Sequence, residues 1–154
     1  MKTYIQFILR IYMAALINIF LIFFSLIFIL NLLTELEFFK EIQVNSFYPL
    51  YLSLINTPMF VFEMFPFIFL ISTQVFFNNL FTNNEMNILK YSGLKNSKIF
   101  SILSITTFLL GIFLIFIFYN FSSNLKYFYL GLKSNYTTDN KYLAVITNNG
   151  LWIK

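Results

Sequence analysis

Three long apolar stretches divide the sequence, and most of its formal charges fall between them. The first stretch lies between Arg10 and Glu35 and holds 24 residues without a charge. Because a helix needs roughly 20 apolar residues to cross a bilayer core, this stretch predicts a membrane span over about 11–33. Its apolar part is longer than the ~7–15 residues of a signal peptide, so we expect a helix that is retained.

The second stretch, Pro49–Leu80, is too long for one straight span perpendicular to the membrane. Its 32 residues would form a helix of about 48 Å, against a bilayer core of about 30 Å. Pro58 and Pro66 interrupt it, and each proline removes a backbone donor and disfavours helix in the residue before it. The pattern predicts an interfacial lead-in over 47–57 and a span over 58–80 that is kinked at Pro66.

The third stretch predicts a span over 99–121. Within it, Thr107 and Gly111 have the four-residue spacing of small side chains that allows two helices to approach closely. The predicted fold class is therefore an all-α transmembrane protein with three membrane-spanning helices.

The tail after the third stretch has the pattern of β structure. Residues 141–147 form a candidate strand, Asn149-Gly150 is a favoured two-residue hairpin turn, and 151–154 begin a returning strand. An isolated hairpin is marginal in water. We therefore expect a transmembrane domain over 1–125 and the truncated start of a β domain over 126–154.

The loop between the second and third stretches carries the signals of a short helix over about 83–91. Thr82 and Glu85 have the spacing of a capping box, and Gly93 suits the left-handed position past a helix end. Two interpretations remain open from these residues alone. The segment is either a linker that lies on the membrane surface or a docking element for a cytoplasmic partner.

The amino-acid composition excludes several classes of function. The chain is 59% hydrophobic and 10% charged, whereas a soluble domain carries about 25% charged residues, so an ordinary soluble enzyme is excluded. His and Cys are absent from the sequence, which removes imidazole bases, thiol nucleophiles and the usual zinc sites. The four isolated glycines form no phosphate-binding loop, so no catalytic, cofactor or metal site is expected.

Glu63 is the one acid inside a predicted span, and it either acts at membrane depth or reaches the interface.

Basic residues near the ends of the spans predict the orientation. Five lie on one side: Lys2, Arg10, Lys90, Lys95 and Lys98. Three lie on the other: Lys40, Lys126 and Lys133. Since cytoplasmic loops carry the excess of Lys and Arg, we expect a cytoplasmic N-terminus and a cytoplasmic second loop. These charges do not cluster, so no nucleic-acid partner is expected.

Three segments carry a resemblance to a known family: the pair Pro58 and Pro66, the loop 84–94, and the tail 148–154. Together they resemble the N-terminal half of the lipopolysaccharide-export permease family LptF/LptG, also called YjgP/YjgQ. The resemblance implies three membrane helices, a periplasmic β-jellyroll and three further helices. The chain would then be half of a permease in the inner membrane of a Gram-negative bacterium, with its tail periplasmic.

The same resemblance implies a role in an ABC-type exporter that extracts lipopolysaccharide for transport to the outer membrane. ATP hydrolysis would reside in a separate subunit, so the chain is not expected to be an enzyme. The implied partners are a cytoplasmic ATPase dimer, a second homologous permease, a single-span periplasmic bridge component, lipopolysaccharide and membrane lipid.

The resemblance also assigns candidate sites. In the family the loop helix is a coupling helix that docks on the ATPase, and Glu85 and Gly93 fall on matching positions. The expected docking residues are Glu85, Met86, Ile88, Leu89 and Gly93, with Ile88 and Leu89 on one face of the helix. Lys40 is the one basic candidate for contact with a lipid headgroup at the outer end of the first span.

Two alternatives come from other classes. A three-span scaffold or assembly protein without transport activity would share the same spans. An intramembrane enzyme is disfavoured, because His and Cys are absent and Glu63 has no second acid beside it in a span.

Overall fold

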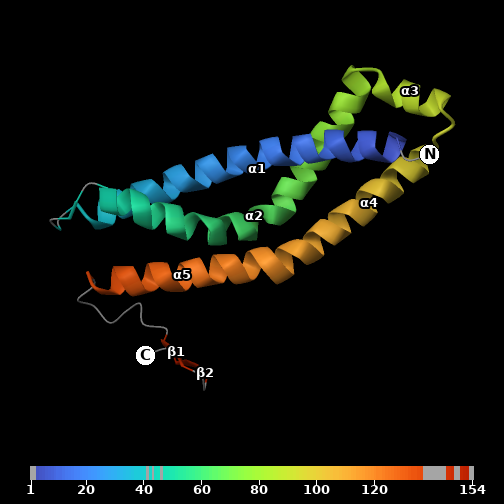
Figure 1. The fold of residues 1–154 in the computed structure, drawn as a ribbon. Helices are drawn as coiled ribbons and strands as arrows, with labels where there is room; N and C mark the ends of the chain where they lie inside the picture. Colours follow the sequence, from blue (N-terminus) through green and yellow to red (C-terminus); the bar gives the residue numbers. More distant parts are fainter. Residues whose placement is uncertain are drawn as a thin grey trace.

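The computed structural model describes residues 3–40, 42, 44–45, 47–136, 145–147 and 150–152. Three long helical rods run beside one another, and a short helix joins two of them at one end (Figure 1). The rods are α1 (Thr3–Phe38), α2 (Phe47–Thr82), and a third formed in succession by α4 (Asn96–Phe113), η1 (Leu114–Phe118) and α5 (Tyr119–Ser134). The short helix is α3 (Glu85–Tyr91), between α2 and α4.

All three rods are long and apolar enough to cross a membrane. They contain 36, 36 and 39 residues, so each extends beyond the predicted span of 11–33, 58–80 or 99–121. The extra turns exist because helix formation is not limited to the apolar stretch. At the N-terminus, for example, Ile8 is fully buried against the other elements and stabilises helix ahead of the first apolar run.

α2 is one helix throughout, with Pro58 and Pro66 inside it. Residues 47–57, expected as an interfacial lead-in, are its first three turns. Figure 1 shows α2 running beside α1, then bending and crossing it to reach α3. Two prolines account for the bend, since each removes a helix hydrogen bond. Ser53 and Thr57 add to it, because each hydroxyl donates to the carbonyl four residues earlier, at 2.7 Å.

The third rod departs from a plain α-helix at its centre. Residues of η1 form a π-helical turn, in which the Tyr119 N–H donates to the carbonyl of Leu114, five residues earlier. The rod then continues through Ser134, so 126–134, assigned by the sequence to the start of a β domain, are helical. Leu125, Tyr129 and Leu132 share one helix face and pack on α1 and α2, and this packing keeps the segment helical.

Side chains pack in three layers along the rods. The layer at the α3 end contains Ile8, Tyr12, Ala15, Phe76, Leu80, Met86, Leu89, Leu94, Ile99 and Leu103. The central layer contains Ile27, Val61, Phe65 and Ile68, with Phe20, Leu114 and Phe118 against them. The layer at the opposite end contains Phe39, Leu52, Ile55 and Tyr129. Other apolar side chains point outward along the rods, as expected of helices solvated by lipid.

Two short strands follow the third rod. β1 (Val145–Thr147) pairs antiparallel with β2 (Gly150–Trp152), and Thr147 lies opposite Gly150. The prediction that Gly150 belongs to the turn is therefore wrong, because Gly150 is the first residue of β2. Residues 148 and 149, which join the strands, lie outside the described residues. One strand pair does not establish a jellyroll, which stays a prediction.

Candidate functional site

The start of α3 differs from the predicted capping box. Thr82 belongs to the last turn of α2, and its hydroxyl donates to the carbonyl of Asn78 at 2.9 Å. Asn84 precedes α3 in a left-handed conformation, with φ of 56° and no side-chain hydrogen bond to the helix. The predicted pairing of Thr82 with Glu85 is wrong, because α2 continues through Thr82 and uses its hydroxyl.

The end of α3 follows the prediction closely. Gly93 has φ of +80°, and its N–H donates to the carbonyl of Lys90 at 2.9 Å. The N–H of Leu94 donates to the carbonyl of Leu89 at 3.1 Å, which completes a Schellman motif. Leu89 and Leu94 are both buried in the same layer, so the motif fixes where the chain leaves α3.

Replacing Gly93 with alanine is expected to destabilise the end of α3 by about 1–2 kcal/mol, since an L side chain is disfavoured at this φ. Gly111 provides the control. A Cβ on Gly111 would meet no atom within 4 Å in the described part of the chain, so the close helix approach predicted there is not made. Gly111→Ala should be neutral or slightly stabilising. Protease cleavage at the 92–95 segment, measured in detergent, should rise for the first variant only.

α3 presents one face to the protein and the other outward. Met86 and Leu89 are buried against α1, α2 and α4, whereas Ile88 is 63% and Tyr91 90% exposed. The prediction that Ile88 and Leu89 share a face is wrong, because consecutive residues project about 100° apart on a helix. Glu85 is partly buried, and its Oε2 has no hydrogen-bond partner among the described residues.

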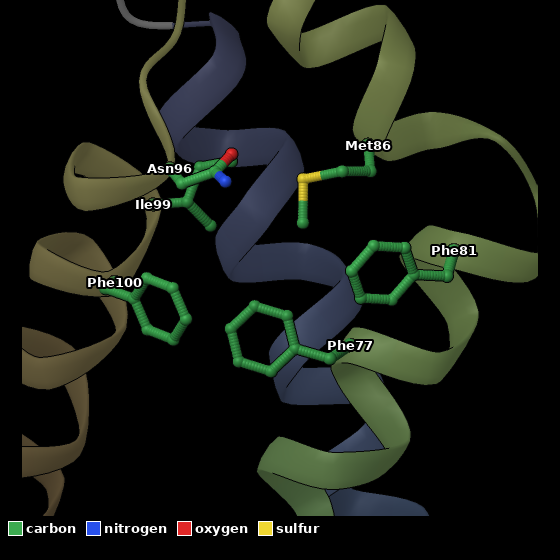
Figure 2. A pocket seen from close by; sticks show the side chains of 6 residues that line it. All are labelled: Phe77, Phe81, Met86, Asn96, Ile99 and Phe100. Atoms are coloured by element: carbon green, nitrogen blue, oxygen red, sulfur yellow. The ribbon is translucent and has the colours of Figure 1, made fainter.

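A pocket of about 270 Å³ lies beside α3. It is lined by Phe77, Phe81, Met86, Asn96, Ile99 and Phe100. Figure 2 shows these side chains converging from the end of α2, from α3 and from the start of α4, with α1 behind them. Of the predicted docking residues, Met86 alone is part of its wall.

A polar cluster that the sequence did not predict lies at the opposite end of the rods. Glu35 of α1 is 1% exposed, and its carboxylate accepts hydrogen bonds from the Tyr129 hydroxyl at 2.6 Å and the Lys133 ammonium at 2.9 Å. The Lys133 ammonium also donates to the Tyr129 hydroxyl at 2.8 Å and lies 4.3 Å from the centre of the Phe38 ring. The cluster ties the end of α1 to α5.

A second contact joins α2 to α5 near this cluster. The Lys126 ammonium donates to the side-chain carbonyl of Asn56 at 2.6 Å and lies 5.0 Å from the centre of the Phe60 ring. Glu63 is exposed on α2, and Lys40 is exposed just beyond α1. These contacts could have been anticipated from the sequence, because the spacing of Lys126, Tyr129 and Lys133 places all three on one face of a helix.

Three rods of this length and hydropathy, with apolar side chains turned outward, define a multi-pass membrane protein. The family model of the lipopolysaccharide export system permease LptF/LptG matches residues 6–154. The chain belongs to this family, whose members are permeases and not themselves enzymes. No curated protein and no solved structure matches the chain.

Proposed function

We propose that the chain is a permease subunit of an ABC-type exporter that extracts lipopolysaccharide from the inner membrane. Membership of the LptF/LptG family supports a role in lipopolysaccharide export. In this proposal a cytoplasmic ATPase dimer supplies the energy, and a second homologous permease and a periplasmic bridge component complete the path. The α3 end of the rods faces the cytoplasm, in agreement with the excess of basic residues there.

The conformation of α3 is the observation on which the proposal depends. An isolated seven-residue helix is unstable in water, yet α3 is held by Met86 and Leu89 on its inner face and by the Schellman motif at its end. This leaves Ile88 and Tyr91 as exposed apolar anchors. Aromatic and aliphatic anchors on a preformed helix are typical of helix-in-groove docking. We infer that Ile88, Tyr91 and Glu85 contact the ATPase, while Met86, Leu89 and Gly93 position the helix.

The side-chain packing between α3 and the three rods would transmit a displacement of α3 to the rods. The layer at this end contains side chains from α1, α2, α3 and α4, and tightly packed interiors transmit displacement. A shift of α3 on the ATPase would therefore move the ends of all three rods together. At the other end, Lys40 is the candidate for contact with a lipid phosphate.

Ile88→Asp is expected to weaken association with the ATPase subunit at least about 30-fold, the loss of one interface hot spot of about 2 kcal/mol. The measurement is co-purification of the full-length permease with the ATPase, followed by a binding titration in detergent. ATP-dependent release of lipopolysaccharide from proteoliposomes should fall together with the affinity for the ATPase.

Tyr127→Asp is the matched control, because Tyr127 is 73% exposed but lies on α5 at the opposite end. This variant should bind the ATPase like the native chain. Native affinity for Ile88→Asp would reject docking through α3. Intact ATPase binding without lipopolysaccharide release by the native complex would instead favour the scaffold alternative.

A further inference from the structure

The pocket beside α3 lies at the predicted membrane boundary. Phe77 and Phe81 are at the end of the predicted span 58–80, and Ile99 and Phe100 are at the start of the span 99–121. The pocket is open to the outside at this level, and its lining residues come from α2, α3 and α4 (Figure 2). Whatever occupies it must therefore come from the edge of the bilayer.

The side chains that line the pocket favour an apolar ligand such as an acyl chain. Among the six side chains around the pocket, Asn96 is the one with a polar amide, and the other five are aromatic, aliphatic or thioether groups. The pocket holds about 270 Å³, which is enough room for the end of an acyl chain. Water has few hydrogen-bond partners there, whereas the end of a lipid tail finds apolar contact on three sides.

The positive charge near the pocket favours a lipid with an anionic headgroup. Lys95 and Lys98 are exposed and flank the lining residues Asn96 and Ile99 in the chain, and Arg10 and Lys90 add two exposed cations at this end. Among the described residues of α3 and of the adjoining ends of α1, α2 and α4, Glu85 is the one acid. Each Lys or Arg near an anionic membrane surface contributes about 1 kcal/mol.

We propose that an anionic phospholipid of the leaflet on the α3 side seats an acyl chain in this pocket, with its headgroup beside Lys95 and Lys98. The lipid would bridge α2, α3 and α4 and fill the space beneath Met86, which holds α3 in place. The proposal requires that the rods cross a bilayer, but it does not depend on ATPase docking or on lipopolysaccharide export.

Tryptophan quenching by brominated lipid tests the proposal. The sequence has one tryptophan, Trp152, so Trp152→Phe gives a silent background into which Phe77→Trp places a probe in the pocket. The full chain is reconstituted in phosphatidylcholine vesicles that contain a minor fraction of brominated phosphatidylglycerol or, separately, brominated phosphatidylcholine. Preference for the anionic lipid at the probe should be at least about fivefold, equivalent to the ~1 kcal/mol that one of the two lysines contributes.

Phe108→Trp in the same background is the control, because Phe108 is exposed on α4 outside the pocket. Its quenching by the two lipids should be nearly equal. Combining Lys95→Gln and Lys98→Gln with the pocket probe should remove the preference for phosphatidylglycerol, while helix content measured by circular dichroism stays unchanged.

Equal quenching of the pocket probe by both lipids would overturn the proposal, as would quenching at Phe108→Trp without quenching in the pocket. The second result would mean that no acyl chain enters the pocket. Phe81→Trp, at a more exposed lining position, repeats the measurement if the larger ring at position 77 disturbs folding.

Discussion

Lys133→Leu is expected to destabilise the bundle by about 3 kcal/mol, because it leaves the Glu35 carboxylate buried without its cation. Glu35 is enclosed by the end of α1 and by α5, and both of its carboxylate oxygens lie within 3.0 Å of the Lys133 ammonium. Removing one partner of a buried ion pair costs about 3–5 kcal/mol. The lower end applies here because Lys133 is partly exposed. The measurement is reversible unfolding in detergent, followed by circular dichroism.

The double variant Glu35→Leu/Lys133→Leu completes the test. Replacing both partners with apolar residues removes the unpaired charge, so most of the lost stability should return. Tyr129→Phe should cost about 1–2 kcal/mol, since it deletes one hydrogen bond to the carboxylate. If Lys133→Leu and the double variant lose stability equally, the pair is not coupled and its geometry does not stabilise the contact between α1 and α5.

Phe65→Ala is expected to cost about 2–3 kcal/mol, because Phe65 joins three elements in the central layer. Its ring stacks on Phe20 of α1 with centroids 5.9 Å apart and meets Phe118 of η1 edge-on at 5.4 Å. Truncating a buried Phe costs about 3–5 kcal/mol in water-soluble proteins. The value is lower here because lipid tails replace some of the lost contacts and no transfer from water is involved.

Phe67→Ala provides the matched control from the same helix. Phe67 lies two residues further along α2 and is exposed, so its truncation should change the free energy of unfolding by less than about 0.5 kcal/mol. Both variants are compared by the same unfolding titration in detergent. Similar losses for the two would mean that the central aromatic contacts do not hold the rods together.

The three rods were predictable because their signal is local. A run of roughly 20 apolar residues specifies a membrane helix whatever its neighbours are. The ends of the rods were not predictable in this way. Residues 47–57 and 126–134 carry mixed polarity, and they are helical because Leu52, Tyr129 and their neighbours pack between α1, α2 and α5.

α3 shows the same division at a smaller scale. Gly93 predicts the end of a helix, because glycine readily adopts the left-handed conformation found there. The structure confirms that α3 ends at this position. The start of α3 was predicted wrongly, because a Thr four residues after a carbonyl can continue a helix as well as cap the next one. Which side of α3 faces inward depends on Tyr12, Phe76 and Ile99, which come from three other elements.

The sequence by itself determined that this protein is a set of three membrane helices with a short helix between the second and third, and it carried the family resemblance. Only the tertiary structure decided that Glu35 pairs with Lys133, 98 residues away, and that the Phe77 and Phe100 rings meet in the lining of one pocket, with centroids 5.0 Å apart (Figure 2). The physical reason is that helix formation responds to neighbours within a turn or two, whereas ion pairs and pockets depend on how separate helices bend and cross.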